Sequence, residues 1–564
     1  MNPTIKLTYK EKTFTLPTAT KVETIIREYL KIECDKLTFF DNPVVALRMN
    51  NEILPFGARV TINATIEPVH LYSDLGKRIY RHSLSYLLSY ASNLLFPKKR
   101  LIIGHALGDG FYFTFQNQSK LEKGDVMALS DKMRELVQQN LPLELVRVAY
   151  QEGVDYFKEK GFLATELLLN YRNDSTIHLY RCEDYLDIAY EPLLSRTGLL
   201  EVWELKEYGD EGMLLRYPLT KNKFQTVAPF KDNPLLFSVF SEYRRWATLL
   251  KVDCIGTMNQ ICGSKDIGTF IRMNEDLHHR KISDIADMID QKEGVKTVLI
   301  SGPSSSGKTT FSIRLAIQLK LLGFDPIKIS LDNYYRPKSQ VPKDLDGNPD
   351  LEILEALDLD LLRENLAALY RNEEVYLPHF EFSGDGKRTF EKEPISLKED
   401  TILVLEGIHA LNPRLLGDID DNSTFKIYIS ALTQLNLDDH NRISTTDNRI
   451  LRRIVRDNKS RSTSAQQTLE MWPSVERGES INIFPYQNEA DIMINSALDY
   501  ELAVLKPYAE PLLRTVKPSA YDAYPVARRL LKFLENVYPI PPNLVPSDSL
   551  LREFIGDSEF HAEC

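Results

Sequence analysis

Apolar runs alternate with helical patterns through the second half of the chain. Residues 295–300, 326–331 and 401–405 are short apolar stretches, which are typical of strands buried on both faces of a parallel sheet. Residues 310–322 place apolar side chains four apart, on one face of a helix. The alternation predicts an α/β domain with a doubly wound parallel sheet over residues 291–515.

The front of the chain has a β-rich pattern. Residues 5–9 alternate apolar and polar side chains, as a strand with one buried face does. Residues 22–30 follow helical spacing, and strand-like runs return at 44–47 and 60–66. This order fits any small α+β domain, and it resembles the β-grasp module called TGS at the front of threonyl-tRNA synthetases. We therefore expect a TGS-like domain over residues 1–68.

Residues 69–240 extend that resemblance. An amphipathic helix is predicted over 78–95, and residues 102–113 have the pattern of a strand, a glycine turn and a second strand. The order resembles the α+β editing domain of threonyl- and alanyl-tRNA synthetases. In that family the helix carries an HxxxH motif, and a Cys and a His follow downstream.

Most of the editing positions are replaced in this chain. The matching positions are His82, Tyr86, Ala189 and Leu193. One imidazole cannot hold a hydrolytic metal ion. We therefore expect the editing fold without its chemistry, and a working deacylase is the less favoured alternative.

Two further segments have no predicted chemistry. Residues 241–290 form a helical connection, in which we expect His278 and His279, beside two cationic residues, to lie on a solvated face. Residues 516–564 give one amphipathic helix and a tail that we expect to pack back on the C-terminal domain.

Residues 302–309, with the sequence GPSSSGKT, match a phosphate-binding P-loop between a strand and a helix. The glycines let the backbone curl, so that loop amides and the helix N-terminus can point at phosphate oxygens. Lys308 adds charge towards the β and γ phosphates, and the Thr309 hydroxyl suits Mg²⁺. The predicted ATP-binding residues are Gly302, Ser304, Ser305, Ser306, Gly307, Lys308, Thr309 and Thr310.

Two acidic residues follow predicted strands of the same sheet. Asp332 comes after the run at 326–331, and Glu406 ends the run at 401–405. Carboxyl ends of parallel strands face the crevice where ligands bind. Asp332 can accept a proton from a hydroxyl and help to hold Mg²⁺, together with Glu406 and Thr309.

The P-loop, the Asp-x-Tyr-Tyr turn at 332–335 and the Glu-Gly-Ile strand end at 406–408 resemble the uridine kinase family, within the wider group of phosphoribulokinase. The resemblance covers residues 290–515. It implies that Asp332 is the general base for a nucleoside 5′-hydroxyl. It also implies that Asp346, or Asp350 beside it, grips the ribose.

The same resemblance implies further roles. Arginines on the stretch 449–461 would form a lid over the triphosphate, with Arg456 and Arg461 assisting transfer and Arg453 near the nucleoside. Tyr335, Phe380 and Phe382 would lie at the substrate. The bland alternative for the arginines is a solvated basic helix.

The base-reading positions depart from the family pattern. Phe380 stands where the family has Tyr, Asp385 where it has His, and Thr463 where it has a lid Arg. In the family, these positions supply the hydrogen bonds that select the base, and such bonds dominate discrimination between similar substrates. The base preference is therefore left open.

Composition narrows the setting. The formal net charge of −11 and a pI near 5.6 argue against a general nucleic-acid coat. Five scattered cysteines suggest a reducing compartment, and no apolar run approaches a membrane span. We also find no pattern of a signal peptide, so the cytoplasm is the expected location.

The leading hypothesis is an ATP- and Mg²⁺-dependent nucleoside kinase acting on a uridine- or cytidine-like 5′-hydroxyl. Its N-terminal half would gate substrate, assemble a homo-oligomer or contact tRNA. One alternative is an ATP-dependent RNA-binding or regulatory protein that uses the P-loop as a switch. Another is a kinase of a different small alcohol, as in phosphoribulokinase.

Overall fold

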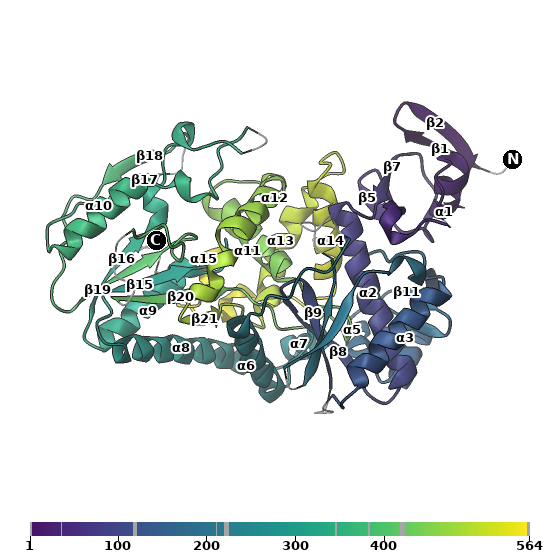
Figure 1. The fold of residues 1–564 in the computed structure, drawn as a ribbon, viewed down its shortest axis with the longest axis horizontal. Helices are drawn as coiled ribbons and strands as arrows, with labels where there is room; N and C mark the ends of the chain where they lie inside the picture. The colour runs from purple at the N-terminus through teal and green to yellow at the C-terminus, as the bar shows by residue number, and fades with distance from the viewer. Residues whose placement is uncertain are drawn as a thin grey trace.

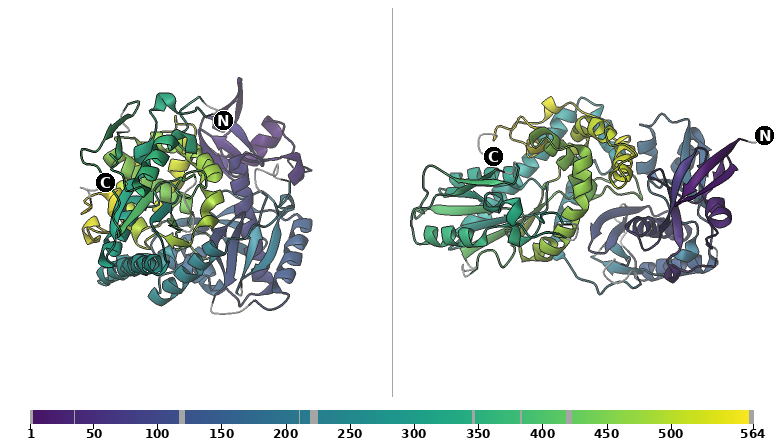
Figure 2. Two further views of the ribbon diagram at one scale, coloured as in Figure 1. Left: turned by 60° about the vertical axis from the view of Figure 1, so that its left-hand side comes forward. Right: turned by 90° about the horizontal axis from the view of Figure 1, so that it is seen from above.

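The computed structural model describes residues 3–34, 36–116, 121–209, 211–218, 225–344, 347–381, 384–417 and 423–560. The molecule is elongated, with the N-terminal sheet at one end and the parallel sheet at the other (Figure 1). Helices from the C-terminal part of the chain lie between these ends, as a second view shows (Figure 2). Among the described residues, no helix is long and apolar enough to cross a membrane.

The N-terminal region is β-rich, as predicted. Its main sheet has the order β2-β1-β7-β4-β5, in which only β1 and β7 pair in parallel. Val22, Ile25 and Ile26 of the helical segment are buried against it. The elements are β1 (Thr4–Tyr9), β2 (Lys12–Pro17), β3 (Thr20–Lys21), α1 (Val22–Thr24), η1 (Ile25–Tyr29), η2 (Phe39–Asp41), β4 (Val44–Met49), β5 (Glu52–Leu54), β6 (Arg59–Val60) and β7 (Ala64–His70).

The second region is built around α2 (Asp74–Leu95). This helix begins before residue 78 because the hydroxyl of Ser73 caps it by accepting the N–H of Gly76 at 3.1 Å. The region also contains two antiparallel sheets, with the strand orders β13-β14-β9-β8 and β10-β11-β12. The elements are β8 (Leu101–Leu107), β9 (Gly110–Phe115), α3 (Asp125–Gln139), β10 (Glu144–Ala149), α4 (Tyr150–Lys160), α5 (Leu163–Leu169), β11 (Thr176–Cys182), β12 (Tyr185–Asp187), η3 (Thr197–Leu199), β13 (Glu204–Tyr208) and β14 (Gly212–Arg216).

Three helices connect the halves: α6 (Pro234–Leu250), α7 (Ile255–Cys262) and α8 (Ile267–Gln291). The expectation of a solvated His278 is wrong, because its side chain is buried. It belongs to the buried stripe of α8 together with Ile271, Ile282 and Ile285, at helical spacing. Burial lowers the pKa of His278 to about 3, so the ring is neutral at physiological pH.

The C-terminal half contains a fully parallel sheet in the order β16-β19-β15-β20-β21. This is the predicted doubly wound α/β architecture. The elements up to β20 are β15 (Thr297–Ser301), α9 (Lys308–Leu321), β16 (Asp325–Ser330), η5 (Leu331–Tyr334), η6 (Lys338–Gln340), η7 (Leu354–Ala356), α10 (Leu359–Tyr370), β17 (Pro378–Glu381), β18 (Lys387–Phe390), β19 (Thr401–Glu406) and β20 (Thr424–Ser430). Those that follow are α11 (Thr445–Ser460), α12 (Ala465–Asn482), η9 (Phe484–Glu489), β21 (Ile492–Asn495), α13 (Glu501–Arg514), α14 (Ala523–Leu534), η10 (Pro542–Leu544) and α15 (Arg552–Ile555).

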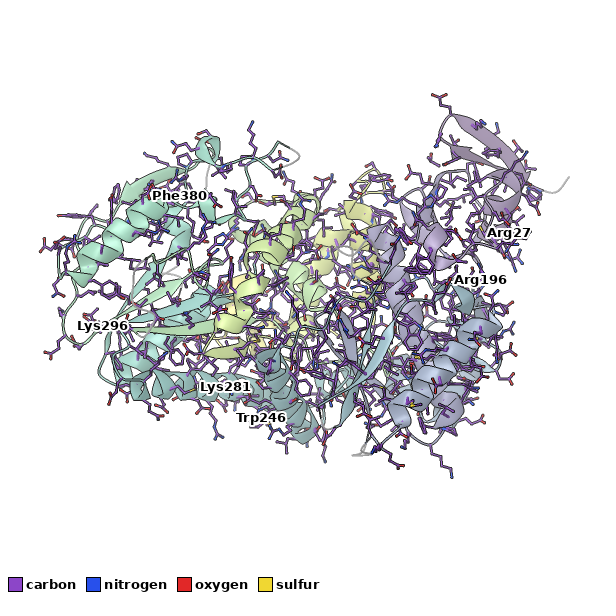
Figure 3. The ribbon with its side chains drawn as sticks, viewed as in Figure 1. Arg27, Arg196, Trp246, Lys281, Lys296 and Phe380 are labelled. Carbon is purple, nitrogen blue, oxygen red and sulfur yellow. The ribbon has the colours of Figure 1, made fainter. Side chains whose placement is uncertain are left out.

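Specific contacts join the regions. Arg196 donates to the carbonyl of Cys34 at 3.2 Å and so ties the second region to the first; Figure 3 labels this arginine. Arg100 pairs with the buried carboxylate of Asp439 in the C-terminal half. Arg48 of β4 lies 4.0 Å from the ring centroid of Tyr521, just before α14. The C-terminal half therefore contacts both earlier regions.

Candidate active site

The P-loop follows β15, and its last two residues, Lys308 and Thr309, begin α9. Gly307 has φ +85° at the N-cap of α9, a conformation that favours glycine. A Cβ at Gly302 would collide with the carbonyl oxygen of Ile429 on the neighbouring strand β20. Both glycines are thus required by the local backbone.

The loop offers unused polar groups. The buried side chains of Ser305 and Ser306 have hydroxyls with no hydrogen-bond partner among the residues that the structure describes. Lys308 folds back, and its Nζ donates to the carbonyls of Gly302 at 3.1 Å and Pro303 at 3.2 Å. Burial lowers the pKa of Lys308. Two such hydroxyls beside a partly buried cation fit a phosphate group.

The two acidic residues lie at the same edge of the sheet as the loop. In the register of the sheet, Glu406 is opposite both Ile300 of β15 and Ser330 of β16. The Ser330 hydroxyl donates to the Glu406 carboxylate at 2.7 Å. Burial, and then the negative charge of Asp332, raise the pKa of Glu406, while the charge of Lys308 opposes that rise. Asp332, Glu406 and Lys308 therefore share one electrostatic environment.

The predicted acceptor side is only partly described. Asp346 and Phe382 lie outside the described residues. The buried hydroxyl of Tyr335 donates to the carbonyl of Leu351 at 3.0 Å, and its ring centroid is 6.4 Å from that of Phe380. Figure 3 labels Phe380 at the far end of the C-terminal half.

Two carboxylates near the acceptor side have distinct settings. The carboxylate of Asp385 accepts hydrogen bonds from the Ser339 amide and hydroxyl, each at 2.8 Å, so it fixes the position of the segment around Ser339. Glu352 has a buried Oε2 with no hydrogen-bond partner among the described residues. Burial raises the pKa of Glu352 to about 7, against the charge of Arg453.

The arginines of α11 divide into two groups. Arg449 donates to the Ser304 carbonyl at 2.8 Å and pairs with Glu479. The fully buried Arg452 donates to the Ser305 carbonyl at 3.3 Å and pairs with Glu501. These two arginines therefore hold the P-loop through its backbone carbonyls. They are buried, so the alternative of a solvated basic helix is wrong for them.

The other three arginines surround Asp457. Arg453 also donates to the Ser304 hydroxyl at 2.8 Å. Arg456 donates to Asp457 at 3.0 Å, and Arg461 lies 3.8 Å from it. The charge of Arg456 lowers the pKa of Arg461, and the charge of Asp332 opposes that shift, so Arg461 lies within electrostatic range of Asp332.

Two contacts to the P-loop were not anticipated from the sequence. Glu479 of α12 accepts the N–H of Ser304 at 2.9 Å. Glu553 of α15 accepts the N–H of Thr310 at 3.3 Å and its hydroxyl at 3.0 Å. Both glutamates occupy amide groups that an anion could use.

A network of charged side chains from both halves of the chain lies beside His82. Arg529 of α14 pairs with Asp447 and lies 3.6 Å from Glu191, which also pairs with Arg78. Burial lowers the pKa of His82, beside this network, to about 4. Among the described residues, no group of His, Cys, Asp and Glu is arranged to hold a metal ion.

A P-loop at the edge of a parallel sheet, facing two strand-end acids, defines a P-loop kinase. Residues 297–503 match the model of the phosphoribulokinase/uridine kinase family, so this part of the chain is a domain of that family.

The N-terminal region is similar to threonine–tRNA ligases. That of Carboxydothermus hydrogenoformans is 28% identical over 158 residues, which cover 28% of this chain and 25% of the relative. That of Nitrosomonas eutropha is 29% identical over 184 residues, 29% of each chain. The chain thus spans well under a third of the length of these relatives. A structure of a possible uridine kinase from Bacillus stearothermophilus is 17% identical, with a TM-score of 0.27, over 38% of this chain and 98% of that one.

Proposed function

We propose that the protein is an ATP- and Mg²⁺-dependent nucleoside kinase that phosphorylates the 5′-hydroxyl of a uridine- or cytidine-like nucleoside. The observation that carries the proposal is the shared environment of Asp332, Glu406 and Lys308. They lie beside a P-loop whose Ser305 and Ser306 hydroxyls have no partner within the described part of the chain. Such a cluster suits phosphoryl transfer to an alcohol.

The donor site is formed by the loop. The hydroxyls of Ser305 and Ser306 would bind phosphate oxygens, with Lys308 neutralising charge. The amides of Ser304 and Thr310 could join them only after leaving Glu479 and Glu553. Thr309, Glu406 and Asp332 would hold Mg²⁺. When bound, ATP supplies the phosphoryl group, and Mg²⁺ offsets the charge that builds up on the phosphates.

Asp332 would remove the proton of the acceptor hydroxyl. The acceptor oxygen then bonds to the γ-phosphorus, the bond from that phosphorus to the bridging oxygen breaks, and ADP leaves. Arg456 and Arg461 would stabilise the charge and exclude water. Arg453, Tyr335, Phe380, Phe382 and Asp346 would line the nucleoside.

Asp332→Asn separates chemistry from binding. We expect transfer from labelled ATP to uridine or cytidine to fall at least about 100-fold, while ATP affinity changes little, because an amide cannot accept the proton. Asp360→Asn, on the surface of α10, is the matched control. Near-normal turnover in Asp332→Asn would exclude its role as the base. If the unmodified protein phosphorylates other small alcohols and neither nucleoside, the nucleoside assignment is wrong.

The similarity to threonine–tRNA ligases favours a second role. We propose that the N-terminal half contacts tRNA, in a cytoplasmic and homo-oligomeric enzyme. Filter binding of a tRNA transcript to the full chain tests this contact. Tight tRNA binding without transfer to any alcohol would favour an RNA-dependent P-loop switch.

A further inference from the structure

A cavity of about 1040 Å³ lies between the two halves of the molecule. One wall comes from β8, β9 and α5, and the other from the C-terminal end of α6 and residues 433–443. Binding sites for small molecules have volumes of this order and often lie between domains. No P-loop residue lines this cavity, so it is separate from the candidate active site.

The α6 wall carries positive charge without a carboxylate partner. Arg244, Arg245 and Lys251 all line the cavity, and none has an ion pair in the described part of the chain. The two buried acids of the lining are already satisfied. Asp439 pairs with Arg100, and Asp438 accepts hydrogen bonds from Asn441 at 2.8 and 2.9 Å. The remaining acids, Glu211 and Asp253, are exposed.

Arg244 is fixed in position by aromatic rings. Its guanidinium lies 5.2 Å from the ring centroid of Tyr112, which stacks on His105 at the same centroid distance. His105 in turn stacks on Phe240 of α6 at 3.5 Å. An arginine held against a ring keeps its N–H edge free for a planar or tetrahedral anion.

His105 gives an independent indication of a ligand. It lines the cavity, is only 8% exposed, and its Nε2 has no hydrogen-bond partner among the described residues. Burial and the neighbouring Arg244 hold its pKa well below the usual range, so the ring is neutral. A neutral imidazole beside fixed cations can donate to or accept from a polar ligand.

We infer that this cavity is a second binding site, for a phosphorylated small molecule about as large as a nucleotide. Arg244 and Arg245 would bind the phosphate oxygens, and Lys251 would add charge at the rim. A cavity of this volume between two halves of the molecule suits a small ligand better than a nucleic-acid strand. The net charge of −11 also argues against an extended basic track.

Calorimetric titration of the full chain with inorganic tripolyphosphate tests the inference. The unmodified protein should show two binding events, and Lys308→Ala should weaken only the one at the P-loop. Arg244→Gln/Arg245→Gln should weaken the other at least about tenfold, because it removes two charged donors. Arg272→Gln/Arg280→Gln, exposed on α8, changes the net charge equally and should leave both events intact.

The inference is overturned if Lys308→Ala abolishes all binding, or if Arg244→Gln/Arg245→Gln leaves both affinities unchanged. Should the double variant fold poorly, the exposed Arg245→Gln alone must still weaken the second event severalfold. If a tRNA transcript loses binding in the double variant while tripolyphosphate binding does not change, the site serves RNA and the small-molecule assignment is wrong.

Discussion

The carboxylate of Glu553 accepts hydrogen bonds from both the backbone N–H and the hydroxyl of Thr310. The contact joins α15 to the first turn of α9, the helix that begins at the P-loop lysine. A Cβ at Gly307 would collide with Leu550 from the same tail. The C-terminal segment thus covers the P-loop on the side of α9.

Glu553→Gln should therefore strengthen ATP binding. The negative charge that now accepts from Thr310 repels phosphates. Its removal weakens the hydrogen bonds that occupy the N–H and the hydroxyl of Thr310. Hydrogen bonds to charged groups contribute about 1.5–3 kcal/mol, so we expect the Kd for ATP to fall about tenfold. Glu559→Gln, on the same tail and bonded to Ser547, is the control for calorimetry. Equal ATP affinities in both variants would contradict a competing role for Glu553.

Glu352, a partly buried residue with a buried Oε2, predicts a pH dependence of stability. Its pKa is raised to about 7 from an ordinary 4.5, so folding favours the protonated form. That contribution is present below pH 4.5 and is lost as the pH rises through 7. The shift corresponds to about 3 kcal/mol. Glu352→Gln cannot ionise, so its Tm should exceed that of the unmodified protein by more at pH 8 than at pH 5.

A matched variant isolates this effect. Glu393→Gln removes an exposed carboxylate, and its Tm difference from the unmodified protein should be the same at both pH values. The facing charged groups are Arg453, Glu479, Lys308 and Asp350. A Tm difference for Glu352→Gln that stays constant with pH would show that Glu352 is ionised throughout.

Arg452 and Arg453 are adjacent in the sequence, but their replacement should have different effects on Tm and on phosphoryl transfer. Arg452→Leu leaves the buried Glu501 without its ion-pair partner, and loss of such a partner costs about 3–5 kcal/mol. Arg453→Leu leaves Asp457 still paired with Arg456, so its Tm should fall less while phosphoryl transfer falls. Thermal melts and a transfer assay compare the two. Similar Tm losses would contradict the division of the α11 arginines into those that hold the P-loop backbone, such as Arg452, and those around Asp457, such as Arg453.

Arg529 should hold the two halves together. Arg529→Ala removes a partly buried cation from between Asp447 and Glu191 and takes from Asp447 its ion-pair partner. We expect faster limited proteolysis in the connection between the halves, with little change for Arg528→Ala, which alters the exposed neighbour. Identical cleavage rates would mean that Arg529 contributes nothing to this interface.

The sequence predicted what local patterns determine. The P-loop is contiguous. Asp332 follows β16 and Glu406 ends β19, two strands whose carboxyl ends must meet in a parallel sheet. Glu479 and Glu553 contact the loop from 175 and 243 residues away, and no local signal marks either acid. The roles of Arg449 and Arg452 were missed because a one-dimensional cluster of arginines does not say which face meets the loop. The buried spacing around His278 was present in the sequence, but its basic neighbours obscured it.

The tail after residue 516 has a practical consequence for dissection of this protein. It carries the cover over Gly307, the anchor of Arg529 and the Tyr521 contact with Arg48. A fragment trimmed to residues 297–503 would expose Leu502, Ala503 and other apolar side chains that now pack in one core with Leu530 and Leu534. Such a fragment should precipitate or bind nucleotide abnormally, so truncation cannot be used to separate the function of the kinase domain from that of the rest of the chain.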